Sequence, residues 1–477
     1  MNKARRTGDN ELRGKVTPQD RTGFRASYNG LCALCVAAVL AVSAEAIAAG
    51  AAPVPSAAAR RANSAFLSGR YELALKRYET AAREVAMRPH ARYMGAVCLF
   101  ELERYEAAAE LFESVYAERE DFYTARLLAD LALARAQDTE TSLGELFSEI
   151  IGRARKELVD KYRGDVFDVR NFVQPAVHTA DFEERFCRAR VAPLLRNRQI
   201  SHELRVGLAL LLPWPDSIKE LEAAARRFSS QPAYRLALAY LYCGGVSGKD
   251  NEGDVRALIE ELRALKRAEP KNGLYDLLLA YCEDRDAMDD VKSALSPERA
   301  RELAALCRRP LQTHLDMLNA ATWKAYLATG YPLYYAKSFR FDGTVPAHVL
   351  LRIARKLGAT ADQLEAEGRA APAQEIRQAV SALAASLAAD NGLFISRLRA
   401  VNIDRYGDGS YERTLGGREA FGEWHARCQE GLTYRVLYTL PLPSLTRAAV
   451  GAMVEDEISY LETTGRIKQE TLPLQED

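Results

Sequence analysis

The sequence predicts an all-α protein, with helical hairpins stacked as an α-solenoid near its start. A further, mostly helical C-terminal region is expected to carry a minor irregular or β element. Three observations support this fold class. The chain is self-similar at a fixed spacing of 34 residues, which separates Tyr71 from Tyr105. Helix-capping signatures, in which a hydroxyl precedes an acidic or amide side chain by three residues, recur along it. Runs that favour β structure are few.

Residues 1–49 are typical of an export signal. Their first part carries seven basic against three acidic side chains, an apolar run follows over Leu31 to Ala44, and Ala46 to Ala48 offer a cleavage triplet. The apolar run has about 14 residues, fewer than the roughly 20 that a spanning helix needs. We therefore expect export to the periplasm or beyond, or alternatively anchoring in the cytoplasmic membrane by residues 31–52. Residues 50–60 are expected to form a linker.

An ungapped internal repeat covers the next part of the chain, where residues 69–81 align with residues 103–115. The matched pairs are aromatic with aromatic, or small with small-to-medium: Tyr71 with Tyr105, Ala74 with Ala108, Tyr78 with Phe112, and Ala81 with Val115. We expect these eight residues to pack successive helices together. A small side chain at Ala74 or Ala108 would allow two helices to approach closely.

This pattern resembles the tetratricopeptide repeat, a helix–turn–helix unit of about 34 residues. The resemblance covers residues 58–137, and a looser version covers residues 232–285. The sequence departs from the family at Ala58 and Arg92, where an aromatic residue is usual, and at Glu103, which replaces the turn glycine. The resemblance implies stacked hairpins that bind a protein or peptide on a concave face.

The rest of the chain divides into broader regions. After repeats over residues 61–140, we expect a helical region with degenerate hairpins over residues 141–310 and a mostly helical C-terminal domain over residues 311–477. Two runs lean toward β structure, Val345 to Leu351 and Tyr434 to Leu440, and the first merges into a helical pattern. A small non-helical patch is expected near Phe339 to Pro346 and Asn402 to Gly417.

Charge and composition disfavour several partners and cofactors. Because 65 basic residues balance 65 acidic ones, the chain offers no net electrostatic attraction to nucleic acid. The cysteines that follow the apolar segment have no C-x-x-C spacing, and the six histidines are scattered singly. We therefore expect no metal and no cofactor.

Three local patterns invite a chemical interpretation, but each favours a structural one. Gly244 to Asp250 lacks the glycine spacing and the hydroxyl of a phosphate-binding loop. Asp404 to Glu412 resembles half of a calcium loop, but two ligand positions of that loop are filled by Tyr and Leu. Glu423, His425 and Cys428 lie close together without an evident orienting group for catalysis. We expect Gly244 to Asp250 to be a helix-terminating loop, and Asp404 to Glu412 to be a glycine-rich turn, with weak calcium binding as the alternative. Surface or packing roles are expected for Glu423, His425 and Cys428.

The densest aromatic cluster of the chain extends from Trp323 to Phe341. Rings concentrated in this way either fill a helix junction or line a recognition surface. If they line a surface, the candidate partner-binding residues are Tyr331, Tyr334, Tyr335 and Phe339.

The sequence thus predicts an exported helical-repeat protein that acts as a protein- or peptide-binding scaffold. It would touch a membrane only through an uncleaved N-terminal segment. The alternative is an envelope-associated enzyme, a hydrolase with its site in the C-terminal region. A buried cluster of convergent histidine and carboxylate groups would favour the enzyme, and a continuous groove would favour the scaffold.

Overall fold

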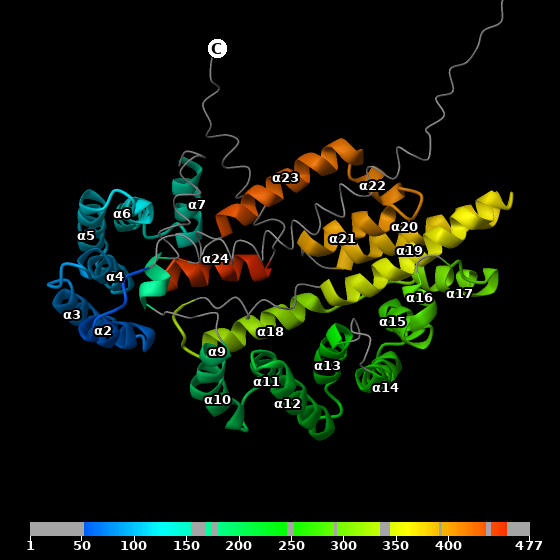
Figure 1. Ribbon diagram of the computed structural model, residues 1–477, viewed down its shortest axis with the longest axis horizontal. Helices are drawn as coiled ribbons and strands as arrows, with labels where there is room; N and C mark the ends of the chain where they lie inside the picture. The colour runs from blue at the N-terminus through cyan, green and yellow to red at the C-terminus, as the bar shows by residue number, and fades with distance from the viewer. Residues whose placement is uncertain are drawn as a thin grey trace, which may run out of the picture. The chain divides into compact units, whose positions relative to one another are not determined.

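The computed structural model describes residues 52–153, 168–173, 180–245, 252–290, 293–333, 344–390, 394–435 and 440–455. Over these ranges every regular element is a helix and no strand occurs (Figure 1). The described residues all belong to one of two compact units, which runs from Ala52 to Asp477. None of the described helices is long and apolar enough to cross a membrane. The expected export signal, residues 1–49, lies outside the described ranges.

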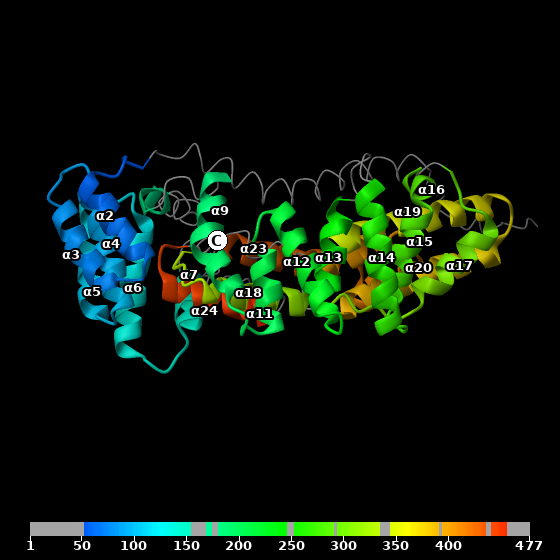
Figure 2. The ribbon, with the colours of Figure 1, turned by 90° about the horizontal axis from the view of Figure 1, so that it is seen from below.

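Six helices open the described chain, and each packs against the next. They are α2 Ala57–Leu67, α3 Tyr71–Ala81, α4 Arg88–Glu101, α5 Tyr105–Glu118, α6 Tyr123–Gln137 and α7 Leu143–Arg153. Figures 1 and 2 both place α2 to α6 side by side. Their apolar residues recur every three or four positions, which gives each helix one face to bury.

The turns that end α2 and α4 have the same geometry, one repeat apart. At the first, the N–H of Gly69 donates to the C=O of Phe66 over 2.8 Å. At the second, the N–H of Glu103 donates to the C=O of Phe100 over 2.9 Å. A further bond from the next residue completes a Schellman helix end in both turns. Both turns place a residue in the left-handed region, with φ of 71° at Gly69 and 60° at Glu103.

An aromatic pair accompanies each of these turns. The rings of Phe66 and Tyr71 have centroids 5.6 Å apart, and those of Phe100 and Tyr105 are 5.0 Å apart. Because turns and ring pairs recur together at the sequence spacing of the repeat, this part of the molecule is repeat-like in structure as well as in sequence.

In the described residues of the middle of the chain, the helical elements are α9 Ala180–Phe186, the π-helical turn η1 Cys187–Val191, α10 Ala192–Arg196, α11 His202–Leu210, α12 Trp214–Arg227, α13 Pro232–Gly245, α14 Glu252–Ala268, α15 Gly273–Glu283, α16 Arg285–Asp289 and α17 Pro297–Cys307. From α11 to α15 each helix packs against its successor. The start of α17 follows its capping signature, because the Ser296 hydroxyl accepts the N–H of Arg299.

The C-terminal part is made of α18 Leu315–Ala328, α19 Thr344–Ala366, α20 Ala370–Asp390, α21 Phe394–Asp404, α22 Ser410–Thr414, α23 Gly417–Arg435 and α24 Pro443–Glu455. The run Val345 to Leu351, which leans toward β structure in the sequence, lies inside α19, in agreement with the helical pattern into which it merges. Its apolar residues continue the helical spacing of Leu350, Ile353 and Leu357, all buried, and this packing outweighs the β preference of its branched side chains.

The other three stretches named from the sequence are helical in part or lie partly outside the described ranges. Asn402 to Gly417 is only partly irregular, since it holds the end of α21 and the whole of α22. Tyr434 and Arg435 are the last residues of α23, and residues 436–439 lie outside the described ranges, as do most of Phe339 to Pro346.

Apolar cores join regions that are distant in sequence. The largest core combines Leu274 and Leu303 with Leu318, Leu350 and Val380, so it spans the position at residue 310 where the sequence suggested a domain boundary. A second core, which we call the repeat core, lies among α2 to α7. It also contains apolar residues from elsewhere in the chain: Val169, Phe172, Val173, Leu333, Leu440, Leu442, Leu445 and Ala449.

Candidate functional site

Helices α2, α4 and α6 contribute polar and aromatic side chains to a surface that later parts of the chain cover. We call this surface the repeat face and define it by Asn63, His90, Tyr93, Glu101 and Thr124. The hydroxyls of Tyr93 and Thr124 lie 3.0 Å apart and join α4 to α6. All five side chains are buried, with His90 at 3% and the Glu101 side chain at 3% exposure. Buried polar groups need partners, and most of the partners here come from outside the repeats.

The first segment on the repeat face is helical and spans residues 168–173. Nε2 of His90 lies 2.7 Å from Oδ2 of Asp168, so the imidazole N–H donates to the carboxylate. The rings of His90 and Phe172 pack with centroids 5.0 Å apart. The side-chain amide of Asn63 donates to the backbone C=O of Phe172 over 2.7 Å. The repeat face therefore contacts this segment through an acid, a ring and a backbone carbonyl.

The second segment on the repeat face is the start of α24. Oε1 of Glu101 accepts the backbone N–H of Ser444 over 2.9 Å and its hydroxyl over 2.7 Å. Arg447, one turn further along, places its guanidinium 3.5 Å from Oε2. A carboxylate at a helix N-terminus satisfies backbone donors that have no partner within the helix and interacts favourably with the helix dipole. Glu101 thus caps a helix that lies 343 residues away in sequence.

The electrostatics of Glu101 reflect this burial. Burial raises the pKa of Glu101 above its usual range, and the bonds from Ser444 together with the charge of Arg447 offset only part of that rise. Burial also raises the pKa of the nearby Cys98 thiol. Near Asp168 two buried atoms, Nδ1 of His90 and Oδ1 of Asp168, have no hydrogen-bond partner among the described residues. Among the described residues, this contact therefore pairs one nitrogen of His90 with one oxygen of Asp168.

The eight repeat-packing residues lie behind this face. Ala74, Tyr78, Ala81, Ala108, Phe112 and Val115 have no exposed surface. Tyr71 and Tyr105 are half-buried, each against the phenylalanine of its turn. The Tyr78 hydroxyl donates to Oδ1 of Asn63 over 2.7 Å and so orients the amide that contacts Phe172.

The predicted aromatic surface is only partly within the described residues. Tyr331 is half-buried, and its ring packs against Phe182 and Phe186 at 5.8 Å and 5.4 Å. Burial raises its pKa. Trp323 and Tyr326 are buried and stacked in the same core. Tyr334, Tyr335 and Phe339 lie outside the described ranges.

The other sequence candidates are used structurally where they are described. Oδ2 of Asp404 accepts the N–H of Glu412, and Oδ1 of Asp408 accepts the N–H of Ser410, so both carboxylates stabilise the turn before α22. His425 packs near Phe394 and Phe421, and burial lowers its pKa. No group of three or more potential metal ligands occurs in the described part of the chain.

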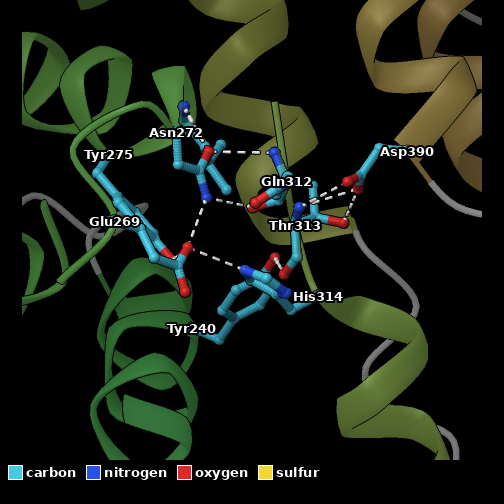
Figure 3. A network of polar contacts seen from close by, with 9 residues as sticks. Tyr240, Glu269, Asn272, Tyr275, Gln312, Thr313, His314 and Asp390 are labelled. Atoms are coloured by element: carbon cyan, nitrogen blue, oxygen red, sulfur yellow. Dashed lines mark hydrogen bonds and ion pairs between the residues drawn. The ribbon is translucent and has the colours of Figure 1, made fainter. Parts of the chain in front are cut away.

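A second polar cluster surrounds Arg309 to His314, which we call the strap (Figure 3). Asn272 binds the backbone of Gln312 twice, because its amide donates to the C=O over 2.8 Å and its oxygen accepts the N–H over 3.1 Å. Asp390 accepts the N–H of Thr313, and the Tyr240 hydroxyl donates to the Thr313 C=O over 2.6 Å. The strap is thereby fixed to α13, α15 and α20.

One end of the strap is closed by Glu269, whose Oε2 lies 3.0 Å from Nε2 of His314. Burial raises the pKa of Glu269, but the bonds from His314, Asn272 and Tyr275 outweigh burial and hold the pKa below its usual range. Most polar groups of this cluster bind backbone atoms. The geometry therefore suits a structural role, in which the cluster holds the strap in place, better than proton transfer to a substrate.

Sequence reasoning missed the polar residues of the repeat face. A signal was present, because Asn63 stands where the next two repeats carry Val97 and Leu131. Likewise, Glu101 is the last residue of the apolar helix α4 and corresponds to Leu67 in the first repeat. A polar residue that replaces an apolar one at a core position of a repeat indicates a specific partner. The identity of those partners required the structure.

Comparisons with protein-family models, with curated proteins and with solved structures gave no match for this chain. The fold and the site define the molecule as an all-α, repeat-like protein whose first helices hold two distant segments of the same chain. Its function is inferred from these contacts.

Proposed function

We propose that this chain is an exported scaffold whose tetratricopeptide-like repeats, stacked as an α-solenoid, bind protein or peptide segments. One observation carries the proposal: the repeat face holds two helical segments that do not belong to the repeats, by contacts suited to peptide recognition. Asn63 and Glu101 bind backbone groups, which any helix supplies, whereas His90 selects for an acid and a ring. Affinity from backbone contacts and specificity from side chains are combined in many peptide-binding modes.

Export is the second part of the proposal and rests on the sequence of residues 1–49. If the signal is cleaved, N-terminal sequencing of protein from the envelope fraction should give a start between Ala46 and Ala52. Recovery from membranes of an intact chain that begins near Met1 would instead indicate an N-terminal anchor.

Affinity capture from the native envelope tests the binding function. The full-length chain should retain a specific species that His90→Ala retains much less, because the substitution removes both the imidazole donor and the stacked ring. Arg126→Ala is the matched control, since Arg126 is exposed on neighbouring α6. Equal recovery of every captured species by wild type and His90→Ala would contradict recognition by the repeat face.

A further inference from the structure

We infer that residues 168–173 are a resident ligand of the repeat face. We also infer that the partner taken by this face is a helical peptide with an acidic residue followed, four positions later, by phenylalanine. This inference rests on the proposed function and names the chemistry of its partner. The partner would displace the chain's own segment in order to bind.

The spacing of the contacts defines the recognised pattern. Asp168 and Phe172 are four residues apart, so they lie on one side of the helical segment, and both contact His90. Val169 and Val173, also four apart, are buried beside them, with exposures of 0% and 2%. Asn171 points elsewhere and is exposed. The two residues that contact His90 therefore come from one helix face, and Arg170 is buried as well.

The receptor side is organised independently of the segment. Tyr78 holds the amide of Asn63 in place, and the His90 ring is packed edge-on to Phe122 at 5.1 Å. Arg119 lies over the Phe122 ring at 4.7 Å and interacts electrostatically with Asp168. An acidic side chain at this position thus meets both an imidazole and a guanidinium, which favours a carboxylate over a neutral group.

Two buried atoms at the contact between His90 and Asp168 have no hydrogen-bond partner among the described residues, a feature that favours exchange over permanent packing. Nδ1 of His90 and Oδ1 of Asp168 are buried without a partner among the described residues, although His90 is only 3% exposed. Groups in a permanent core are nearly always bonded, and an unbonded one weakens the contact that buries it. A competing ligand that also bonds Nδ1 of His90 would bind the same face more tightly.

Tethering explains how an imperfect segment can still occupy the face. A segment on the same chain acts at an effective concentration on the order of millimolar. The apparent affinity of a partner is therefore its intrinsic affinity multiplied by the fraction of molecules in which the face is vacant. Weakening the resident segment should strengthen binding of a peptide added in trans.

The test uses the full-length chain and a fluorescent, helix-stabilised peptide with the sequence of residues 168–173, Asp-Val-Arg-Asn-Phe-Val, and blocked ends. The double variant Asp168→Ala/Phe172→Ala should bind this peptide about tenfold or more tightly than wild type, because the face is vacated more often. Adding His90→Ala to the double variant should remove the gain. Asn171→Ala, on the exposed side of the same segment, should behave as wild type.

Two control peptides establish the pattern itself. Replacing the aspartate of the peptide by asparagine, or its phenylalanine by alanine, should each weaken binding to the double variant. If the folded double variant binds the peptide no better than wild type, residues 168–173 are core and not ligand. A double variant that fails to fold would overturn the inference as well.

Hydrogen exchange on the wild-type chain gives a second measurement without substitutions. Excess peptide should increase exchange at the backbone amides of residues 168–173, because the peptide displaces them, and unchanged exchange at saturating peptide would overturn the inference. If envelope capture depends on His90 while these peptide results are negative, the inference fails and the proposed function stands. If the peptide binds as described while nothing is captured, the proposed function fails instead.

Discussion

At the scale of single residues, Gly69 and Glu103 occupy equivalent turns in the same left-handed backbone conformation, with φ of 71° and 60°. A residue with a Cβ is strained there by roughly 1–2 kcal/mol, whereas glycine is not. A Cβ added at Gly69 meets nothing within 4 Å, so a substitution there isolates the backbone effect.

Glu103→Gly should therefore raise the unfolding midpoint, and Gly69→Ala should lower it, each by about 1 kcal/mol in the free energy of unfolding. Chemical denaturation of the two variants beside wild type measures both changes. If Glu103→Gly and Gly69→Ala change the free energy of unfolding in the same direction, the two turns are not equivalent.

Glu101 provides a pH-dependent prediction. Because burial raises its folded-state pKa above the unfolded value, the folded state binds more protons, and its stability falls as pH rises through the folded pKa. Glu101→Gln keeps an oxygen for the Ser444 donors but cannot ionise. The stability of wild type relative to Glu101→Gln should decrease as the pH rises over the range above the usual glutamate pKa of about 4.3.

Thermal melts of both proteins across that range measure the difference, and a wild type that gains relative stability with rising pH would contradict the assigned environment. Glu101→Ala is the matched deletion. It should destabilise at every pH by about 1–3 kcal/mol, because the N–H and hydroxyl of Ser444 lose their acceptor.

At the scale of helices, α3 and α5 approach their neighbours through small side chains. Ala108 has no exposed surface, and the adjacent Ala107 is exposed on the same helix. Ala108→Leu should lower the melting temperature through overpacking, which typically costs about 1–3 kcal/mol, and Ala107→Leu should not. Equal melting temperatures for the two leucine variants, with helicity preserved, would count against close packing at Ala108.

The strap connects helices that are distant in sequence, and Asn272 makes two of the hydrogen bonds that hold it. Asn272→Ala leaves the N–H and the C=O of Gln312 without their partner, so we expect a loss of about 1–3 kcal/mol in the free energy of unfolding. Lys271→Ala, at the exposed neighbouring position, is the control. Denaturant titration measures the free energy of unfolding of both variants. If Asn272→Ala is as stable as Lys271→Ala, Asn272 does not hold the strap in place.

The helices themselves could be predicted from sequence because their signals are local. The buried positions of α3 and α5 follow from apolar spacing, and the start of α17 follows from the Ser296 cap. Val345 to Leu351 is ambiguous in the sequence because a short run of branched side chains looks alike in a strand and in a buried helix.

The contacts of the repeat face could not be predicted, because they join residues that no local period relates. Asn63 meets Phe172 across 109 positions, and Glu101 meets Ser444 across 343. The sequence shows that Asn63 and Glu101 are polar where apolar residues are expected, but it does not show which distant segment each contacts.

At the scale of the whole unit, the repeats are connected to the rest of the chain through what covers their face. Residues 168–173 and the start of α24 enter the repeat core together with Leu440, Leu442 and Leu445. The repeat face is therefore covered by segments of its own chain, and under the proposed function a partner has to compete with them.

A double-mutant cycle on His90 and Asp168 tests this arrangement most directly. The free energy of unfolding is measured for wild type, His90→Ala, Asp168→Ala and the double variant of the full-length chain. If the repeat face holds residues 168–173 as described, the two substitutions are coupled by about 0.5–3 kcal/mol, because either one alone already breaks the 2.7 Å contact. Strictly additive effects would show that His90 and Asp168 do not meet and would contradict the site.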